Sequence, residues 1–423
     1  MGTRPTLAVA AAILLTTGPL AVADEAGLKK LDADIAKCLK SSCSSLYLSD
    51  KLTEIPERVS MVPGIVTLGL GRMKIDDLSM LRRMPQLRSL NLGGTLVDDL
   101  TVLTDLPALE DLQLDRTQVR SIEALSSHGA LGRLGLAGTV VTDLSPVAKL
   151  PNLRNLDISR SAVTDLAPVT SMTGLEQLNL YGLKAADFTA LSGLRRMRQL
   201  NASGTVLSDL AVVTGMPGLQ NLDVSGTAVA DIAPLAGIPG LRNLNLARTR
   251  VSDLAPLSDN VGLSWLSLRS APVSDLSPLA DHPVLHNLDL QDTRVTDLSP
   301  LQDIETLQHL DIGSTGINDL APLAGKARLQ SLRLSKSDVT SIEPVATLSR
   351  LRSLDLRETG VTDLSPLAGL EELRDVTLDA TGVTDLTPLM GLPGLKSVYL
   401  RRVEGLDEAQ VKALEGKGVR VAR

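Results

Sequence analysis

One pattern of leucines recurs every 22 residues through most of this chain. It reads L-x-x-L-x-L and appears as LRNLDL at Leu153, LRNLNL at Leu241 and LRSLDL at Leu351. The spacing never slips, and a degenerate first copy begins at Cys43. A short period held this long predicts stacked repeats, in which each unit covers the apolar face of its neighbour. The regular units begin at Ile65, Leu87, Leu109, Leu131, Leu153, Leu175, Met197, Leu219, Leu241, Leu263, Leu285, Leu307, Leu329, Leu351, Leu373 and Leu395.

Each unit is expected to contribute one short β-strand. Leucines at unit positions 1, 4 and 6 point inward, because alternate residues of a strand share one face. Aromatic residues make up only 1% of the chain, so the core must be aliphatic. The repeats therefore predict an α/β solenoid in which each unit adds one short strand and one short helical turn on the outer side.

The stretch TRVTDLSPL, from Thr293 to Leu301, shows how each unit bends from strand to outer turn. Most units have Thr or Ser at position 9, and we expect these hydroxyls to bond buried backbone groups from one turn to the next. Position 13 is Asp or Ser, such as Asp297, which are residue types that cap the free amides at a helix start. A proline such as Pro300 follows in the same turn, where its missing N–H matters little.

Both ends of such an array must be covered. The segment DEAGLKKLDADIAKCLKSS predicts an amphipathic capping helix over residues 24–42. The segment LDEAQVKALEGKGVRV predicts a helix and a strand within a second cap, residues 403–423. Between the caps, residues 43–402 are expected to form the repeat array of about 17 units.

The first 23 residues have the pattern of a signal peptide. Arg4 is followed by an apolar run from Leu7 to Leu15 and by AVA, a small-residue cleavage site that ends at Ala23. The alternative is a membrane helix, but spanning a bilayer takes ~20 apolar residues. We therefore expect cleavage near Ala23 and a location in the periplasm or outside the cell.

The only two cysteines are Cys38 and Cys43. In an oxidising compartment a disulfide is the expected state, and two buried free thiols are the alternative. No histidine lies near them in the sequence, which argues against a zinc site. The net charge of -7, without a basic run that contains aromatic residues, argues against nucleic-acid binding.

The repeats resemble bacterial leucine-rich repeats of the 22-residue internalin-like type, whose units run L-x-x-L-x-L, an Asn, and then I-x-D-I-x-P-L. The resemblance covers about Cys43 to Arg402. It implies a curved solenoid, a horseshoe with a parallel β-sheet on the concave face, where partners are usually bound, and short helical turns on the convex side. This sequence departs from the family in having Thr in place of the Asn ladder and a short helical cap. It also has neither an immunoglobulin-like domain after the repeats nor a surface anchor, so host-cell adhesion does not follow from the resemblance.

Function is sought at unit positions 2, 3, 5, 7 and 8, which we expect on the concave face. A tryptophan exposed on a face with few aromatic residues is a candidate binding hot spot. One alternative is that these are scattered surface residues. Another is a His/Asp metal site, but the sequence shows no residues that would orient the ligands, so no metal is predicted. The predicted partner-binding residues are Trp265, His286, Asn287, Asp289, His309 and Asp311.

The sequence predicts a binding protein rather than an enzyme. It has no G-x-S-x-G elbow, P-loop, H-E-x-x-H motif or Cys–His pairing. We expect a secreted or periplasmic monomer that binds a protein or polysaccharide on its concave face, without a cofactor, nucleic acid or stable membrane insertion. The alternatives are a structural or spacer protein of the cell envelope and a host-directed effector.

Overall fold

The computed structural model describes residues 25–423 and divides the chain into two compact units. The first unit ends at Val206, and the second runs from Leu207 to Arg423. The signal-peptide prediction for residues 1–23 lies outside the described residues. Each unit is a stack of coils, and the two are described separately below.

The first unit begins with helix α2, Glu25–Ser41. Its strands are β1 (Ser45–Tyr47), β2 (Thr67–Gly69), β3 (Ser89–Asn91), β4 (Asp111–Gln113), β5 (Arg133–Gly135), β6 (Asn155–Asp157), β7 (Gln177–Asn179) and β8 (Gln199–Asn201). Short 3-10 helices connect them: η1 (Glu57–Val59), η2 (Ser79–Arg83), η3 (Thr101–Asp105), η4 (Glu123–Leu125), η5 (Ser145–Val147), η6 (Ala167–Ser171) and η7 (Thr189–Gly193).

The second unit has the same construction and ends with helix α3, Glu408–Gly416. Its strands are β9 (Asn221–Asp223), β10 (Asn243–Asn245), β11 (Trp265–Ser267), β12 (Asn287–Asp289), β13 (His309–Asp311), β14 (Ser331–Arg333), β15 (Ser353–Asp355), β16 (Asp375–Thr377), β17 (Ser397–Tyr399) and β18 (Arg420–Ala422). Its 3-10 helices are η8 (Leu210–Val213), η9 (Ala233–Gly237), η10 (Ala255–Leu257), η11 (Ser277–Leu279), η12 (Ser299–Leu301), η13 (Ala321–Leu323), η14 (Glu343–Thr347), η15 (Ser365–Leu367) and η16 (Thr387–Leu389).

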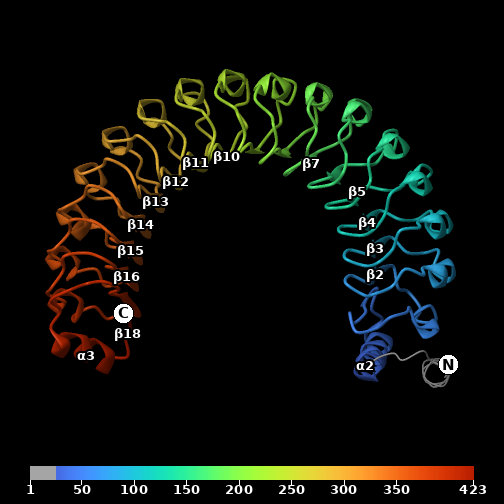
Figure 1. The fold of residues 1–423 in the computed structure, drawn as a ribbon, viewed down its shortest axis with the longest axis horizontal. Helices are drawn as coiled ribbons and strands as arrows, with labels where there is room; N and C mark the ends of the chain where they lie inside the picture. Colours follow the sequence, from blue (N-terminus) through green and yellow to red (C-terminus); the bar gives the residue numbers. More distant parts are fainter. Residues whose placement is uncertain (1–24) are drawn as a thin grey trace, which may run out of the picture. The chain divides into compact units, whose positions relative to one another are not determined.

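Within each unit, every repeat strand pairs in parallel with the strand of the next coil, in a register of one repeat. Trp265 pairs with Asn287, for example, and Asn287 with His309. In both units the strands line the inner side of the curve and the 3-10 helices line the outer side (Figure 1). The predicted leucine-rich-repeat solenoid is thus confirmed. The outer turns are 3-10 because segments of three to five residues are too short for a stable α-helix.

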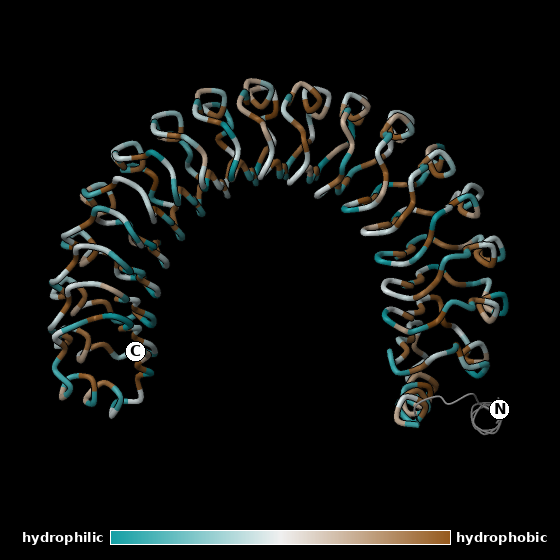
Figure 2. Tube along the Cα trace, viewed as in Figure 1, coloured by the Kyte–Doolittle hydropathy of each residue, from teal (hydrophilic) through white to brown (hydrophobic). Residues whose placement is uncertain are grey.

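The core of each coil is the aliphatic column predicted from the repeat. At β11, for example, Leu263, Leu266 and Leu268 are completely buried. Figure 2 shows hydrophobic residues recurring at the same places in successive coils. Because each coil presents this face to the next, burial of the leucines supplies the main driving force for stacking.

The threonine column is buried as predicted, but its bonding differs from the prediction. Each hydroxyl donates to the carbonyl three residues earlier in its own coil, as Thr293 Oγ1 does to Leu290 O at 2.7 Å. It does not link one turn to the next in this way, because that local carbonyl is the nearest acceptor as the chain leaves the strand. The same bond is made by Thr95, Thr117, Thr139, Ser161, Thr205, Thr227, Thr249, Thr315, Ser337, Thr359 and Thr381.

The acidic column at position 13 caps the outer turns, as predicted. Asp297 Oδ1 accepts from the backbone N–H of Ser299 at 2.8 Å, two residues further along. Ser121 and Ser341, which replace Asp in two units, accept from the equivalent N–H groups at 3.3 and 3.4 Å. These bonds occupy amides that would otherwise lack a partner at the start of each turn.

Unit position 20 contains buried polar residues whose role the sequence did not reveal. His128 and His282 are buried there, together with Asn260 and Lys326. Each side chain reaches a backbone carbonyl of the preceding coil; the Nε2 atom of His282, for example, lies 3.2 Å from Leu257 O. They therefore join neighbouring coils through hydrogen bonds at a position that is usually apolar.

Position 8 has a positive φ in every unit from Ile65 onward, which the sequence prediction missed. Glycine occupies the position in some units, such as Gly94 at φ 74°, where the lack of a Cβ makes this conformation accessible. Other units place larger residues there, such as Arg116 at φ 57°. The left-handed residue turns the chain out of each strand, and it is thus a structural part of the repeat.

The two ends are closed by helices. In the first unit, α2 buries Leu31 and Ile35 beside the first coil, and a disulfide joins Cys38 to Cys43. In the second unit, Asp407 caps α3 by accepting from Ala409 N at 2.8 Å. Strand β18 then pairs in parallel with β17 and covers its free edge.

Candidate functional site

The six predicted partner-binding residues lie together on three adjacent strands of the second unit. Trp265 in β11, Asn287 in β12 and His309 in β13 occupy one row across the sheet. Asp289 and Asp311 lie two residues further along β12 and β13, after the buried leucine of each strand, and they pair with each other across the sheet. His286 precedes β12, and its backbone carbonyl accepts from His309 N at 3.0 Å. We call this set the tryptophan patch.

Four side chains of the patch have unused hydrogen-bonding groups. Trp265, His286 and Asn287 are half-buried, and His309 is exposed. Among residues 25–423, none of these side chains makes a hydrogen bond or ion pair. An indole N–H, two imidazoles and a carboxamide therefore remain available to a partner.

In two parts of the sheet outside the patch, the equivalent row is bonded within the solenoid. In the first unit, Asn155 Nδ2 donates to Gln177 Oε1 of the next strand at 3.0 Å. In the second unit, Asn243 Nδ2 donates to Asn221 Oδ1. Such lateral bonds use the polar groups of one strand to satisfy those of its neighbour. The tryptophan patch differs because its large side chains leave that capacity unused.

The two aspartates of the patch serve the solenoid itself. Asp289 Oδ1 accepts from Gln291 N at 3.0 Å, and its Oδ2 accepts from Ser267 Oγ at 3.1 Å. Asp311 Oδ1 accepts from Gly313 N at 3.0 Å, and its Oδ2 lies 3.6 Å from Arg333 Nη1. Because both oxygens of each carboxylate already have partners, these aspartates hold the strand ends in place below the patch.

This aspartate role recurs along the sheet. In nine units an Asp or Asn at position 5 accepts from the N–H at position 7, a short Asx turn at the strand end. Two further units lack that residue, and there an Asp at position 7 of the preceding coil does the same: Asp115 accepts from Ala137 N, and Asp379 from Arg401 N. The Asp and Asn side chains at unit position 5 therefore have a largely structural role.

The electrostatics of the patch favour neutral groups. Burial raises the pKa of Asp311; the Gly313 N–H opposes this rise, and the nearby Asp289 carboxylate adds to it. Burial also lowers the pKa of His309, and the Arg333 guanidinium lowers it further. The His309 imidazole is therefore neutral at neutral pH, so one ring nitrogen can donate a hydrogen bond while the other accepts one.

Two exposed valines extend the patch, and the sequence prediction did not include them. Val261 lies just before β11 and is 49% exposed; Val284 lies just before β12 and is 38% exposed. Most other units have Pro, Gly or a polar residue at these two positions. Valine at these two positions departs from the usual residue types, and this departure is the sequence signal that could have identified both residues. The valines add apolar surface at the edge of the row that contains Trp265.

Residues 25–423 contain neither a metal-ligand cluster nor a helix that could cross a membrane. No group of three or more His, Cys, Asp and Glu side chains there is placed to hold a metal ion. No helix in that range is both long and apolar enough to cross a membrane.

The sequence matches no family model, and no curated protein sequence matches it. Its structure is similar to that of a leucine-rich-repeat protein of Leptospira interrogans, with a TM-score of 0.62 and 17% identity over 92% of this chain and 98% of that chain. It is also similar to an internalin (InlF) from Listeria monocytogenes, with a TM-score of 0.53 and 21% identity over 83% of this chain and 94% of that one. The ectodomain of the Arabidopsis receptor kinase HAESA, solved with a peptide hormone, gives a TM-score of 0.65 and 15% identity over 87% of this chain and 68% of the ectodomain chain.

Identities this low establish the fold alone. The leucine-rich-repeat fold is typical of proteins that bind other proteins, and it generally carries no catalytic site. The chain is a leucine-rich-repeat protein with 22-residue units, similar in structure to the internalins of Listeria and to the Leptospira protein.

Proposed function

We propose that this chain is a non-catalytic binding protein that recognises a partner protein through the tryptophan patch. The observation that carries the proposal is the row that runs from the chain's single tryptophan to His309, with His286 beside it; the polar groups of these four side chains, Asn287 included, have no partner among the described residues. Binding hot spots are enriched in tryptophan and lie among residues that exclude water. Val261 and Val284 supply such apolar neighbours.

Export from the cytoplasm is part of the proposal. It rests on the signal-peptide pattern that ends at Ala23 and is supported by the disulfide between Cys38 and Cys43. Disulfides persist in oxidising compartments and are rare in the cytosol. N-terminal sequencing of the protein recovered from cell fractions tests this part. We expect a mature chain that begins at Asp24; an intact chain found only in the cytoplasm would refute export.

A photo-crosslinking amino acid can identify the partner. Placed at His309, which is exposed on β13, it should form an adduct with one major protein in the native cells. The same amino acid at Gln199, an exposed residue in the equivalent row of the first unit, is the matched control. An adduct that forms equally at both sites, or at neither, would count against the tryptophan patch.

The affinity of the identified partner then tests the residues. Replacing Trp265, His286 and His309 together with Ala should weaken binding at least tenfold, because hot-spot residues contribute roughly 2 kcal/mol or more each. The double variant Gln177→Ala/Gln199→Ala should bind as the wild type does. Since Trp265 is the only tryptophan, a change in its fluorescence on adding the partner would report contact at the patch directly.

A further inference from the structure

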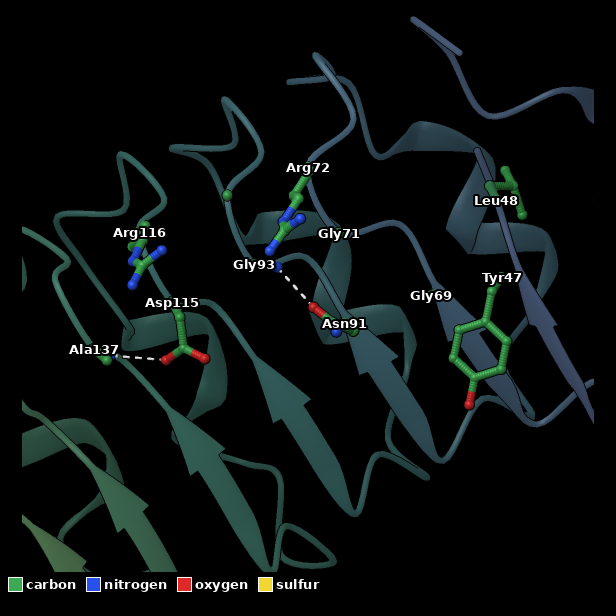
Figure 3. A pocket seen from close by; sticks show the side chains of 11 residues that line it. Tyr47, Leu48, Gly69, Gly71, Arg72, Asn91, Gly93, Asp115, Arg116 and Ala137 are labelled. Atoms are coloured by element: carbon green, nitrogen blue, oxygen red, sulfur yellow. Dashed lines mark hydrogen bonds between the residues drawn. The ribbon is translucent and has the colours of Figure 1, made fainter. Parts of the chain in front are cut away.

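A groove in the first unit lies apart from the tryptophan patch. It has a volume of about 570 Å³ and runs along the C-terminal ends of strands β1 to β5 (Figure 3). That volume falls within the range of roughly 300–1,000 Å³ typical of ligand sites. Its rim carries Tyr47, Arg72 and Arg116, and its floor is formed largely by glycine backbone.

Two arginines on the rim make no salt bridge. Arg72 and Arg116 are both exposed, and neither makes a salt bridge or side-chain hydrogen bond within residues 25–423. Arg160, two coils beyond Arg116, differs: its Nη2 donates to the Tyr181 hydroxyl at 2.7 Å, and its guanidinium lies 4.6 Å from the centre of that ring. The groove therefore presents two guanidinium groups that make no salt bridge or side-chain hydrogen bond, although the charge of Arg116 acts on the nearby Asp115 carboxylate.

Glycines leave the space in which these arginines lie. Arg72 and Arg116 occupy position 8 of alternate coils, and the coils between and beyond them have Gly94 and Gly138 there. A Cβ on Gly94 would lie 3.5 Å from Arg72 Cγ, and one on Gly138 would lie 3.4 Å from Arg116 Cγ. The two arginines are thus about two strand spacings apart, or ~9.6 Å. At these distances a Cβ would be in ordinary van der Waals contact with the arginine stem, so each arginine lies close to the glycine of the next coil.

Tyr47 provides a flat apolar surface at one end of the groove. Its ring lies across Gly69, where a Cβ would collide with it, and the residue is 64% exposed (Figure 3). One face of the ring therefore rests on backbone while much of the residue is open to solvent. Aromatic rings of this kind combine an apolar face with a polar hydroxyl. The ring can stack on the C–H face of a sugar.

The groove also has a free backbone donor and a carboxylate acceptor. Gly69 is the residue at position 5 of its unit. In nine other units an Asp or Asn at this position accepts a hydrogen bond from the N–H at position 7. Within the described chain, the N–H of Gly71 consequently has no acceptor. Asp115 accepts from Ala137 N through Oδ1, which leaves Oδ2 for a hydroxyl donor.

We propose that this groove binds an acidic polysaccharide whose sugar rings carry carboxylates. One ring stacks on Tyr47, carboxylates pair with Arg72 and Arg116, a ligand oxygen accepts from Gly71 N–H, and a sugar hydroxyl donates to Asp115. An acidic peptide fits less well, because the glycine floor offers no apolar pocket for side chains. Neighbouring strands also use the strand edges that a peptide would need for β-pairing.

Calorimetric titration of the intact protein with polygalacturonate tests the charge contacts. Binding should weaken as salt rises, because exposed charge pairs are screened. The variant Arg72→Gly/Arg116→Gly should lose at least tenfold in affinity. Glycine suits the positive φ at both positions, so this variant should remain folded. Arg248→Gly/Arg402→Gly makes the same change at position 8 of the second unit and should bind as the wild type does. Unchanged binding by the first variant would overturn the proposal.

Two further measurements fix the class of ligand and the role of Tyr47. Polyglutamate and a neutral galactan should each bind at least tenfold more weakly than polygalacturonate; equal or tighter binding of polyglutamate would assign the groove to acidic peptides instead. Tyr47→Ala and Gly69→Ala, which displaces the ring, should each lose polygalacturonate binding. Retention in both would refute stacking. Trp265→Ala should leave this binding unchanged, so failure here and failure of the partner-protein proposal remain separate results.

Discussion

At the scale of single residues, unit position 8 combines a fixed backbone conformation with variable side chains. A residue with a Cβ in the left-handed region costs roughly 1–2 kcal/mol relative to right-handed conformations. The repeat accepts that strain at residues such as Arg72, Lys336 and Ala380. In the groove of the first unit, the strained residues are the arginines assigned here to ligand binding. The same conformation recurs outside the groove, at residues such as Arg248 and Asp292, so the strain belongs to the repeat.

Ala380 allows the strain itself to be measured, because its methyl group makes no polar contact. Its φ is 55°. Ala380→Gly should raise the free energy of unfolding by about 0.5–1 kcal/mol, the relief of strain less the greater chain entropy of unfolded glycine. Chemical denaturation monitored by circular dichroism measures it. Ala413→Gly, in helix α3, is the control for the opposite effect, because it should lower the free energy of unfolding by about 1 kcal/mol. A loss of stability in Ala380→Gly would contradict the strain argument.

His282 should make stability depend on pH. Burial lowers its pKa in the folded state, although the Leu257 carbonyl and Asp281 favour the protonated form. The unfolded chain therefore binds this proton more readily, so the stabilisation is full above the ordinary histidine pKa of about 6.5 and is lost as pH falls below it. His282→Leu, which matches the apolar residue of most units, should reduce that loss. Urea unfolding between pH 8 and pH 5 measures the free energy of unfolding of both proteins. An equal loss of stability in the two proteins as pH falls would contradict the prediction.

These residue-scale features show what the sequence could and could not predict. Glycine at position 8 in several units signalled a positive φ, but the arginines there masked it. The buried role of His282 depends on a carbonyl of the preceding coil, a contact that no pattern within one repeat contains. The sequence thus predicted the columns whose residue type recurs from coil to coil, and it missed features at positions where the residue type varies.

At the scale of elements, the short outer turns are fixed by their first residues. Asp275, Asp297 and Asp363 each accept both the backbone N–H and the hydroxyl of the serine two residues later. Hydrogen bonds to a carboxylate favour its ionised form, so the pKa of each lies below its ordinary value. The stability from these caps is therefore present above the ordinary Asp pKa and is lost as pH falls through the lowered folded-state values.

Removing the hydroxyls should shift this acid transition. In the triple variant Ser277→Ala/Ser299→Ala/Ser365→Ala, each aspartate keeps its N–H bond and loses one donor. The folded-state pKa of each carboxyl should rise toward the ordinary Asp value, so the triple variant should lose less stability than the wild type between pH 5 and pH 2.5, and its loss should end at a higher pH. Urea unfolding between pH 5 and pH 2.5 measures the shift. Ser353→Ala, on the sheet face and not preceded by such an aspartate, should leave the profile unchanged. Identical profiles for triple variant and wild type would refute the role of the hydroxyls.

The repeat predicted where the strands and outer turns lie. It did not predict the type of helix in the outer turns or the chemistry of the tryptophan patch. The 22-residue period predicted where every strand would lie, because each leucine column must meet its neighbour. It could not distinguish 3-10 from α-helical turns, since both satisfy the same capping pattern. The sequence also predicted that the residues of the tryptophan patch lie together, because residues one repeat apart pair across adjacent strands. Its aspartates proved to be strand-end caps, because position 5 faces both the surface and the adjacent turn.

At the scale of the whole molecule, a solenoid depends on the closure of its last coil. Strand β18 covers the edge of β17, with Leu400 N donating to Ala422 O at 2.7 Å. Helix α3 buries Val411 and Leu414 at the same end. Without these elements the last coil would expose unpaired backbone groups and an apolar face, both of which promote association with other chains.

Deleting residues 403–423 should therefore convert a monodisperse protein into one that associates as concentration rises. The deletion should also lower the unfolding midpoint, because the last coil loses its buried contacts. Size-exclusion chromatography with light scattering measures the mass of both proteins. Glu408→Gln is the control, since it breaks only the exposed ion pair with Arg423, which contributes little, and it should leave the mass unchanged. A truncated chain with the mass and midpoint of the wild type would show that the second unit is stable without its cap, and that stacking within the array alone is sufficient.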